Sequence, residues 1–296
     1  YTPWLNEDGR LEADLTVAKL KSDRYLVVVT DTMHRHAQNW LKRHIPDDAH
    51  AFVTDMTAAY AQLNIQGPTS RDLLQSITSA DLSNAAFPYR HVAEIAIGFA
   101  RLICVRLTYV GELGYELYIP TEQATHVYDA IVDAGQRFNL RHAGLKALAS
   151  LRLEKGYRDY GHDMDNTDDP YEVGLGFTIK LDKPAGFIGK EACARKMAHG
   201  HPTRRLAQVL VKDPAPLLFH AEVVSRNGKP VGYVRSGSYG YTLGGAVGLF
   251  MIETDEAIDQ AYIEAGKWEI DIAGKVYPAI VSFSPLYDPG MVRIRS

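Results

Sequence analysis

Residues 107–119, with the sequence LTYVGELGYELYI, decide how the rest of the chain is interpreted. Gly111 and Gly114 bracket a turn between two alternating stretches, and this pattern predicts a β-hairpin with its incoming arm at 107–109. On the outgoing strand, Glu116 and Tyr118 share one face, while apolar residues share the other. Two interpretations of Glu116 are open: a solvated acid on an edge strand, or a carboxylate in an aromatic pocket that binds a ligand.

The remaining sequence changes character near residue 203. Before that point, strand and helix patterns alternate, and after it almost every segment resembles a strand or a turn. Asn227 and Gly228 form the strongest short hairpin signal, and residues 272–275 suit a second hairpin turn. We therefore predict an α+β region over 1–202 and a small antiparallel barrel or sandwich over 203–296.

Regular elements are expected at defined positions within the first region. Residues 25–29 predict a fully buried strand, and Ser70 and Thr121 are predicted helix N-caps. The predicted strands lie within 1–30 and at 51–53, 61–65 and 92–97; the predicted helices begin near 32, 70, 121, 145 and 190.

Length, charge and cysteine usage exclude several classes of protein. At 296 residues the chain can bury a large core, and its 46% hydrophobic and 23% charged residues indicate a folded protein. A net charge of −4 argues against nucleic acid or an anionic membrane surface as the main partner. No apolar run reaches the roughly 20 residues that span a bilayer. The two cysteines, Cys104 and Cys193, suit buried thiols in a reducing compartment.

Several motifs occur in an order that resembles a known family. They are Y-x-G-E-x-G-x-E at 109–116, L-N-x-x-G-x-x-x-A-D-L-T-V at 5–17 and S-L-R-L-E-K-G at 150–156, followed by D-M-D at 163–165, P-x-E-x-G-L at 170–175 and F-I-G-K-E-A at 187–192. Together they resemble the folate-binding aminomethyltransferase superfamily, which includes the glycine cleavage T-protein. The likeness is greatest to the C-terminal half of dimethylglycine and sarcosine dehydrogenases. It implies aminomethyltransferase-like folate-binding domains followed by a C-terminal antiparallel β-barrel.

The resemblance also implies roles for five residues. Asp14 matches an aspartate that acts at the reacting nitrogens of tetrahydrofolate, where a carboxylate can accept a proton. Glu116 matches a glutamate that accepts hydrogen bonds from the pterin N–H donors. Tyr1, Thr16 and Tyr109 match residues that contact the folate. From the pattern alone, Asp14 is a surface acid on a strand, and the tyrosines are ordinary core residues.

The function that follows from this resemblance is one-carbon transfer. Tetrahydrofolate captures an iminium formed by oxidation of dimethylglycine or sarcosine, giving 5,10-methylenetetrahydrofolate. No FAD-binding pattern is visible, so the partner that carries the flavin would be an N-terminal domain outside this chain. We expect the chain to be the later part of a longer polypeptide, in the bacterial cytoplasm or the mitochondrial matrix.

Two alternatives remain open. The first is a free-standing aminomethyltransferase or folate-dependent demethylase, although Leu148 replaces an arginine of the glycine-cleavage enzymes. The second is a non-catalytic subunit, because the regulatory subunit of pyruvate dehydrogenase phosphatase resembles the same scaffold.

Other polar residues suggest no further site. His34, His36 and His44 lack a companion carboxylate at metal-ligand spacing, so no metal is predicted. The acids Asp163, Asp165, Asp168 and Asp169 lack the register of a calcium loop and predict a solvated loop. The pair at 204–205 is expected to be surface arginine.

Overall fold

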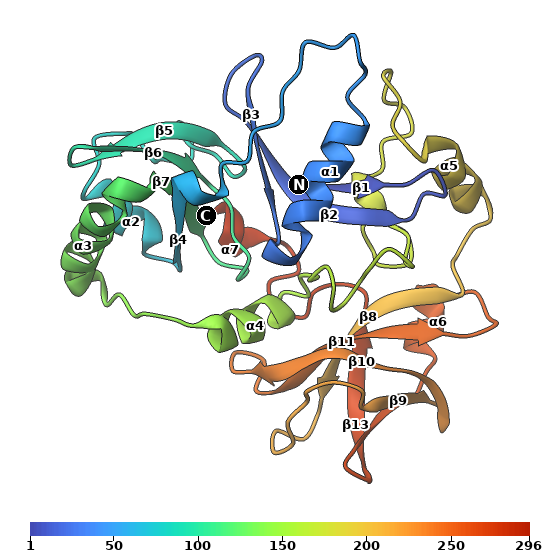
Figure 1. The fold of residues 1–296 in the computed structure, drawn as a ribbon. Helices are drawn as coiled ribbons and strands as arrows, with labels where there is room; N and C mark the ends of the chain where they lie inside the picture. The colour runs from blue at the N-terminus through green and yellow to red at the C-terminus, as the bar shows by residue number, and fades with distance from the viewer. The chain divides into compact units, whose positions relative to one another are not determined.

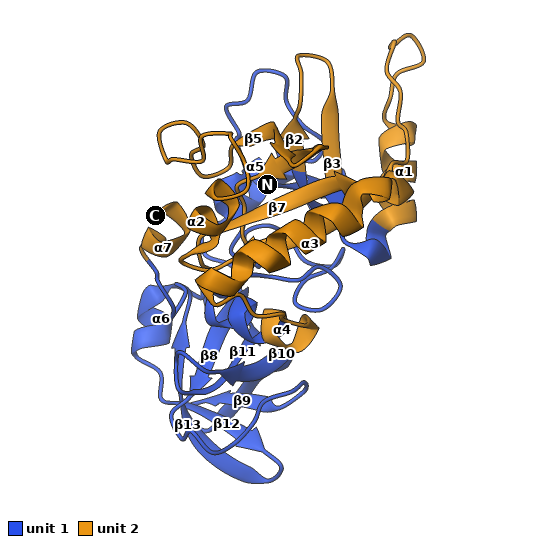
Figure 2. Cartoon of the chain, turned by 90° about the vertical axis from the view of Figure 1, so that its left-hand side faces the viewer, with its two compact units in different colours: residues 1–16, 28–33, 149–289 blue, residues 17–27, 34–148, 290–296 orange.

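The computed structural model describes residues 1–296, which divide into two compact units (Figure 2). Unit 1 comprises residues 1–16, 28–33 and 149–289, and unit 2 comprises residues 17–27, 34–148 and 290–296. No helix in the structure is long and apolar enough to span a bilayer.

Unit 1 begins with a short antiparallel strand pair (Figure 1). Strand β1 (Thr2–Leu5) pairs with β2 (Leu11–Lys19), and the sheet order is β1-β2-β3. The end of β2 and most of β3 (Tyr25–Val29) are among residues 17–27 of unit 2. Asn6 shapes the β1–β2 turn, since its side-chain oxygen accepts the backbone N–H groups of Asp8 and Arg10 at 3.1 and 3.0 Å. The prediction that β3 is fully buried is wrong, because none of its residues is buried.

The C-terminal part of unit 1 is a closed barrel of six antiparallel strands, in the order β10-β11-β8-β13-β12-β9. The strands are β8 (Arg204–Val211), β9 (Val223–Arg226), β10 (Lys229–Gly240), β11 (Gly245–Glu253), β12 (Trp268–Ile272) and β13 (Lys275–Ser282). Asn227 and Gly228 both have positive φ in the β9–β10 turn, which confirms the hairpin predicted there. The second predicted hairpin, β12–β13, is also confirmed.

Helices complete unit 1. The C-terminal part of α4 (Leu145–Glu154) and the whole of α5 (Lys190–Ala198) belong to this unit. Helix α6 (Gln260–Glu264) is capped by Asp259, whose carboxylate accepts the Tyr262 N–H at 2.8 Å. Both α4 and α5 lie where the sequence predicts helices. Short 3-10 helices lie at η1 (Asp31–Met33) and η5 (Gly176–Thr178). The predicted boundary at 202/203 directly precedes β8, and it stays a prediction.

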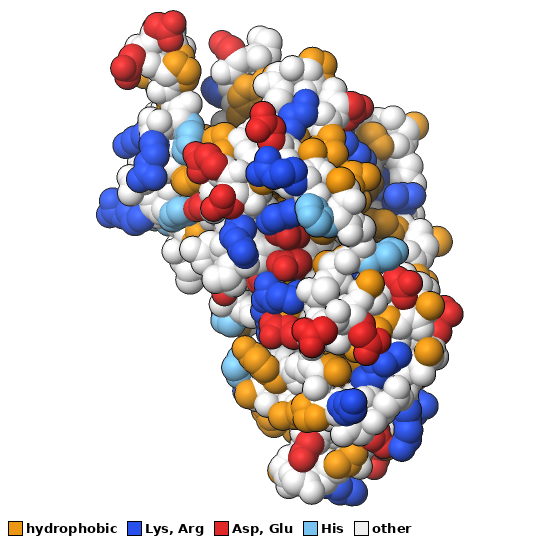
Figure 3. Space-filling model, turned by 90° about the vertical axis from the view of Figure 1, so that its right-hand side faces the viewer, with side chains coloured by type: hydrophobic (Ala, Val, Ile, Leu, Met, Phe, Trp, Pro, Cys, Tyr) orange, Lys and Arg blue, Asp and Glu red, His pale blue; other side chains and the backbone are white.

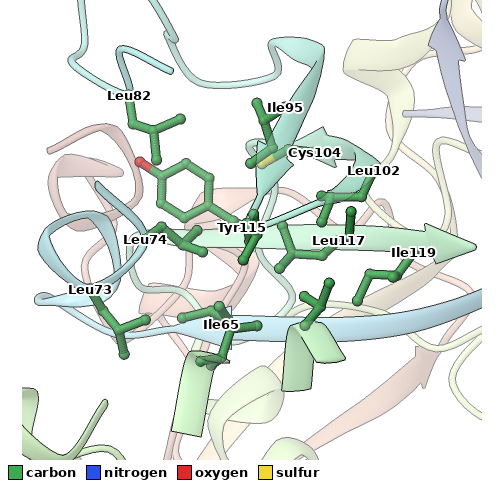
Figure 4. Close-up of a cluster of buried hydrophobic side chains, with 14 of the residues drawn as sticks. Ile65, Leu73, Leu74, Leu82, Ile95, Leu102, Cys104, Tyr115, Leu117 and Ile119 are labelled. Atoms are coloured by element: carbon green, nitrogen blue, oxygen red, sulfur yellow. The ribbon is translucent and has the colours of Figure 1, made fainter. Parts of the chain in front are cut away.

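Unit 2 is built on a four-stranded antiparallel sheet of order β4-β7-β6-β5. The strands are β4 (Tyr60–Gln66), β5 (Val92–Ile97), β6 (Ala100–Val105) and β7 (Gly114–Pro120). Tyr115, Leu117 and Ile119 of β7 are fully buried among apolar side chains, as Figure 4 shows. Because β7 lies between β4 and β6, the edge-strand interpretation of Glu116 is wrong.

The helices of unit 2 include two that pack on this sheet. Both α2 (Ser70–Gln75) and α3 (Ala124–Gly135) contact β7, and Val127 and Ile131 of α3 are buried in the core. The other helices are α1 (His34–Arg43) and α7 (Val292–Arg295), with 3-10 helices η2 (Thr57–Ala59), η3 (Thr121–Gln123) and η4 (Gln136–Phe138).

Three local predictions for unit 2 are wrong. Strand β6 ends at Val105, so residues 106–113 form a connecting loop and not the arm of a tight hairpin. Residues 51–53 have no regular structure. Neither predicted N-cap forms: the Ser70 hydroxyl donates to the Leu113 carbonyl at 3.2 Å, and the Thr121 hydroxyl donates to that of Ala58 at 2.9 Å. Tertiary hydrogen bonds have replaced the local caps.

Candidate functional site

Asp14, Thr16 and Tyr1, three of the five predicted site residues, lie on one face of the β1–β2 pair in unit 1. Alternation along β2 buries Leu11, Ala13 and Leu15 and turns Asp14 and Thr16 to the opposite face. The β1–β2 register places Pro3 opposite Asp14, so Tyr1 extends the same face. The Tyr1 hydroxyl donates a hydrogen bond to Asp14 Oδ2 at 3.0 Å.

The Asp14 carboxyl group holds its proton unusually tightly. Burial raises the pKa of Asp14 from 3.8 to about 6, against the lowering effect of the Tyr1 hydrogen bond, and the negative charge of Asp159 raises it further. A carboxyl group with a pKa near 6 gains and loses a proton close to neutral pH. Asp14 is therefore suited to accept a proton from a weakly basic amine.

A loop of unit 1 holds the first residue of β2 at both of its backbone groups. The Leu11 N–H donates to the Asp168 carbonyl at 3.0 Å, and the Tyr160 hydroxyl donates to the Leu11 carbonyl at 3.3 Å. Burial raises the pKa of Tyr160, and the charges of nearby acids, including Glu12 and Asp14, raise it further. The backbone three residues before Asp14 is thus fixed from outside the strand.

Three of the four acids of this loop, Asp163, Asp168 and Asp169, are buried, which contradicts the predicted solvated loop, whereas Asp165 is exposed as predicted. Asp163 and Asp168 are both 0% exposed. Asp163 pairs with Arg152, and Asp168 binds Arg204 at 3.1 Å and Arg235 at 2.8 Å. Buried charges require such partners, but these arginines lie 11, 36 and 67 residues from the acids they bind, and no local pattern links them to the loop.

Arg204 and Arg205, predicted to be surface arginines, are both half-buried and make contacts that the sequence patterns did not indicate. Besides Asp168, the Arg204 guanidinium binds Glu172 at 3.3 Å and Glu253 at 3.2 Å. The Arg205 guanidinium lies 4.4 Å from the centre of the Phe283 ring, and burial lowers the pKa of Arg205. Both side chains therefore belong to the structure of unit 1.

Glu116 lies in unit 2 on the face of β7 that points away from the apolar core. The Tyr118 hydroxyl donates to Glu116 Oε2 at 2.7 Å, and Oε1 has no partner within the protein. Burial raises the pKa of Glu116, and the hydrogen bond from Tyr118 opposes this shift. Glu116 is thus a half-buried carboxylate with one oxygen available to an external donor.

Tyr109 lies half-buried in the loop 106–113 of the same unit. The loop is held at its start by Arg106, a buried arginine that the sequence patterns did not single out. Its guanidinium donates to the carbonyl groups of Phe87 at 2.9 Å and Ser296 at 2.6 Å. Gly111 has a φ of +76°, which favours glycine at that turn.

The structure thus forms two groups from the five predicted residues. Unit 1 brings together Tyr1, Asp14 and Thr16, and unit 2 holds Tyr109 and Glu116. That the two groups bind one ligand stays a prediction. Their carboxylates share two properties, partial burial and a tyrosine hydroxyl as partner, which suit them to bind a ligand with N–H donors.

The α+β region followed by a closed antiparallel barrel is the architecture of an aminomethyltransferase-type protein. The chain belongs to the glycine cleavage T-protein family. The family's GCVT N-terminal domain matches residues 1–183, and its glycine cleavage T-protein C-terminal barrel domain matches residues 204–288. The predicted family and fold class are therefore confirmed.

The relatives of this chain include both an enzyme and a regulatory subunit. The chain is 44% identical over 297 residues to 4-methylaminobutanoate oxidase (formaldehyde-forming) of Paenarthrobacter nicotinovorans, covering 100% of this chain and 35% of that protein. It is 33% identical over 298 residues to the mitochondrial pyruvate dehydrogenase phosphatase regulatory subunit of Mus musculus, covering 97% and 34%. The chain therefore spans about a third of the length of these relatives.

A solved structure shows the same fold. The glycine cleavage system aminomethyltransferase T from Bartonella henselae superposes with a TM-score of 0.80 at 21% sequence identity, covering 97% of this chain and 75% of that one. At this identity the likeness establishes the architecture, and the chemistry must be argued from the side chains.

Proposed function

We propose that this chain binds tetrahydrofolate and catalyses one-carbon transfer, in which the folate captures an iminium from an oxidised N-methyl amine, the original C–N bond breaks to release the demethylated amine, and 5,10-methylenetetrahydrofolate forms. The observation that supports this most directly is the Asp14 carboxyl group, hydrogen-bonded to Tyr1 and with a pKa of about 6. The amine substrate would be of the dimethylglycine or sarcosine class. A flavin that oxidises it would belong to a partner domain outside the chain.

Asp14 would act as the proton acceptor. Tetrahydrofolate supplies weakly nucleophilic nitrogens, and an aryl amine must lose a proton when it bonds to carbon. A carboxylate with a pKa near 6 is ionised at neutral pH and still basic enough to take that proton. The Tyr1 hydroxyl, which donates to Oδ2, would orient the carboxylate and leave Oδ1 for the reacting amine.

Glu116 would bind the pterin ring. The ring presents adjacent N–H donors, and a carboxylate accepts such a pair with both oxygens. Glu116 fits this role because Oε1 has no partner in the protein and Tyr118 fixes the position of Oε2. Tyr109, half-buried on the loop beside this strand, and Thr16, on the face of Asp14, would add contacts to the same ligand.

Transfer can be measured with an iminium made in solution from sarcosine and formaldehyde. We expect the chain to accelerate formation of 5,10-methylenetetrahydrofolate above the uncatalysed rate. Asp14→Asn should reduce the catalysed part by about 10²- to 10⁴-fold, the usual contribution of a general base. Tyr1→Phe serves as the milder control, since it removes only the orienting hydroxyl. Equal rates for Asp14→Asn and the unmodified chain would remove Asp14 from the chemistry.

Binding of tetrahydrofolate distinguishes this proposal from a non-catalytic regulatory function, the alternative that the similarity to the phosphatase regulatory subunit suggests. Calorimetric titration with tetrahydrofolate should give saturable binding, weakened by about 1–3 kcal/mol in Glu116→Gln because pterin donors lose a charged acceptor. Glu94→Gln, an exposed acid on β5, is the matched control. No binding of tetrahydrofolate by the unmodified chain would support the regulatory alternative.

A further inference from the structure

A charged cavity lies on the barrel, within unit 1, and its lining includes none of the five predicted folate-site residues. Its volume is about 590 Å³, within the range of roughly 300–1,000 Å³ that small-molecule sites occupy. It is lined by the β9–β10 turn, the end of β11, the following loop and α6: Arg226, Lys229, Pro230, Val231, Glu253, Thr254, Asp255, Glu256 and Tyr262. On the molecular face shown in Figure 3, acidic and basic side chains likewise lie close together.

The basic wall of the cavity contains a guanidinium whose position is fixed. Arg226 lies 3.9 Å from the centre of the Tyr262 ring, and its Nε donates to the Tyr262 carbonyl at 3.1 Å. Gly266 makes room for it, because a Cβ at that position would lie 2.8 Å from Arg226 Nε. These contacts use the ring-facing surface and Nε, so both terminal nitrogens are left without a protein partner.

Lys229 extends this basic wall. It is the residue paired with Arg226 across the hairpin turn, and its ammonium group makes no ion pair in the structure. Two cations are therefore neighbours, and together they have three nitrogen atoms without a partner: the two terminal nitrogens of Arg226 and Nζ of Lys229. A fixed planar guanidinium is the group that best recognises a carboxylate, through two parallel hydrogen bonds.

The opposite wall is acidic. Glu253 is held by Arg204 at 3.2 Å, whereas the carboxylates of Asp255 and Glu256 have no hydrogen-bond or ion-pair partner. An anion that bound the arginine would be repelled by these acids, and a simple amine would be repelled by the cations. A ligand that carries both charges satisfies both walls, and Pro230 and Val231 add apolar surface for a carbon chain.

We propose that this cavity binds a small zwitterion of the amino-acid or short-peptide class. Its carboxylate would pair with Arg226 and Lys229, and its ammonium group with Asp255 and Glu256. The site goes beyond the proposed one-carbon transfer, and it uses none of the residues placed in that reaction.

The test is a calorimetric or NMR titration of the full chain with 6-aminohexanoate and triglycine, beside hexanoate and hexylamine, which carry one charge each. We expect at least one zwitterion to bind about tenfold more tightly than either single-charge probe, because only a zwitterion pairs with both walls. Arg226→Met should weaken zwitterion binding by about tenfold or more, and Arg226→Lys by less, since lysine keeps the charge and loses the planar fork.

A sharper test is a double variant that should change the affinities for the zwitterion and for hexanoate in opposite directions. The double substitution Asp255→Asn and Glu256→Gln should weaken zwitterion binding and strengthen hexanoate binding, because the repulsive wall becomes neutral. Lys229→Met tests the basic wall at an exposed position without partners, so it should weaken zwitterion binding even if the Arg226 variants fail to fold. Glu116→Gln should leave these affinities unchanged, which distinguishes this site from folate binding. Equal binding of hexanoate and the zwitterions, or no effect of Arg226→Met and Lys229→Met, would overturn the proposal.

Discussion

Replacing Asp14 by Asn should make the protein more stable at neutral pH and leave its stability unchanged in mild acid. In the folded state the pKa of Asp14 is about 6, compared with 3.8 when the group is exposed. The folded protein therefore binds this proton more tightly than the unfolded chain does. Ionisation of Asp14 then reduces the free energy of unfolding as the pH rises from about 4 to about 6. Asparagine stays neutral and can still accept the Tyr1 hydrogen bond.

The size of the effect follows from the shift. About two pKa units at about 1.4 kcal/mol each give an upper limit of about 3 kcal/mol. Asp14 keeps some contact with solvent, which screens its charge, so we expect about 1–2 kcal/mol at pH 7. The gain should be close to zero at pH 4, grow through pH 5, and stay constant above pH 7.

The assay is urea denaturation at a series of pH values, followed by tryptophan fluorescence. Trp4 and Trp268 belong to unit 1 and Trp40 to unit 2, so a Trp40→Phe background makes the signal report on the unit that contains Asp14. This matters because two compact units need not unfold in one transition. Asp23→Asn, at an exposed carboxylate, controls for the change in net charge.

Two results would refute the reasoning. A stability difference that does not depend on pH would show that the asparagine acts through packing and not through loss of the carboxylate charge. A loss of stability at pH 7 that exceeds the loss at pH 4 would show that ionised Asp14 stabilises the fold, the opposite of what its raised pKa requires.

The remaining predictions concern unit 1. Asp168→Asn leaves Arg204 and Arg235 without their shared buried anion, and it should lower the free energy of unfolding by about 3–5 kcal/mol in denaturation at pH 7; a loss below about 1 kcal/mol would contradict a structural role. Gly232→Ala places a Cβ on the Met251 carbonyl oxygen inside the barrel, so it should cost about 1–3 kcal/mol in melting experiments, whereas Gly144→Ala, with open space around it, should be nearly neutral.

Sequence periodicity could predict those parts of the fold that local rules determine. The Asn-Gly turn at 227–228 needs positive φ at both positions, and the barrel hairpin forms there. Alternation along β2 and β7 placed Asp14 and Glu116 opposite the buried faces of their strands. These results depend on residues within a few positions of one another.

Other features depend on partners far along the chain, and the sequence patterns missed them. Ser70 has the chemistry of a helix cap, yet its hydroxyl bonds to Leu113, 43 residues away. Asp163 and Asp168 resemble solvated loop acids until the fold supplies arginines, of which Arg235 is 67 residues from Asp168. Burial of a charge is a property of the assembled unit, because only tertiary packing can provide the opposite charge.

The nature of the partner distinguishes the loop acids Asp163 and Asp168 from the half-buried acids Asp14 and Glu116. Asp163 and Asp168 bind guanidinium groups, which neutralise them and fix the loop. Asp14 and Glu116 receive only a tyrosine hydroxyl each, and burial raises the pKa of both. A neutral donor orients a carboxylate without neutralising its charge, so these two acids retain their attraction for a cationic or N–H-rich ligand. Because keeping them ionised costs folding free energy, stability alone does not account for their presence, and ligand binding gives a physical reason for it.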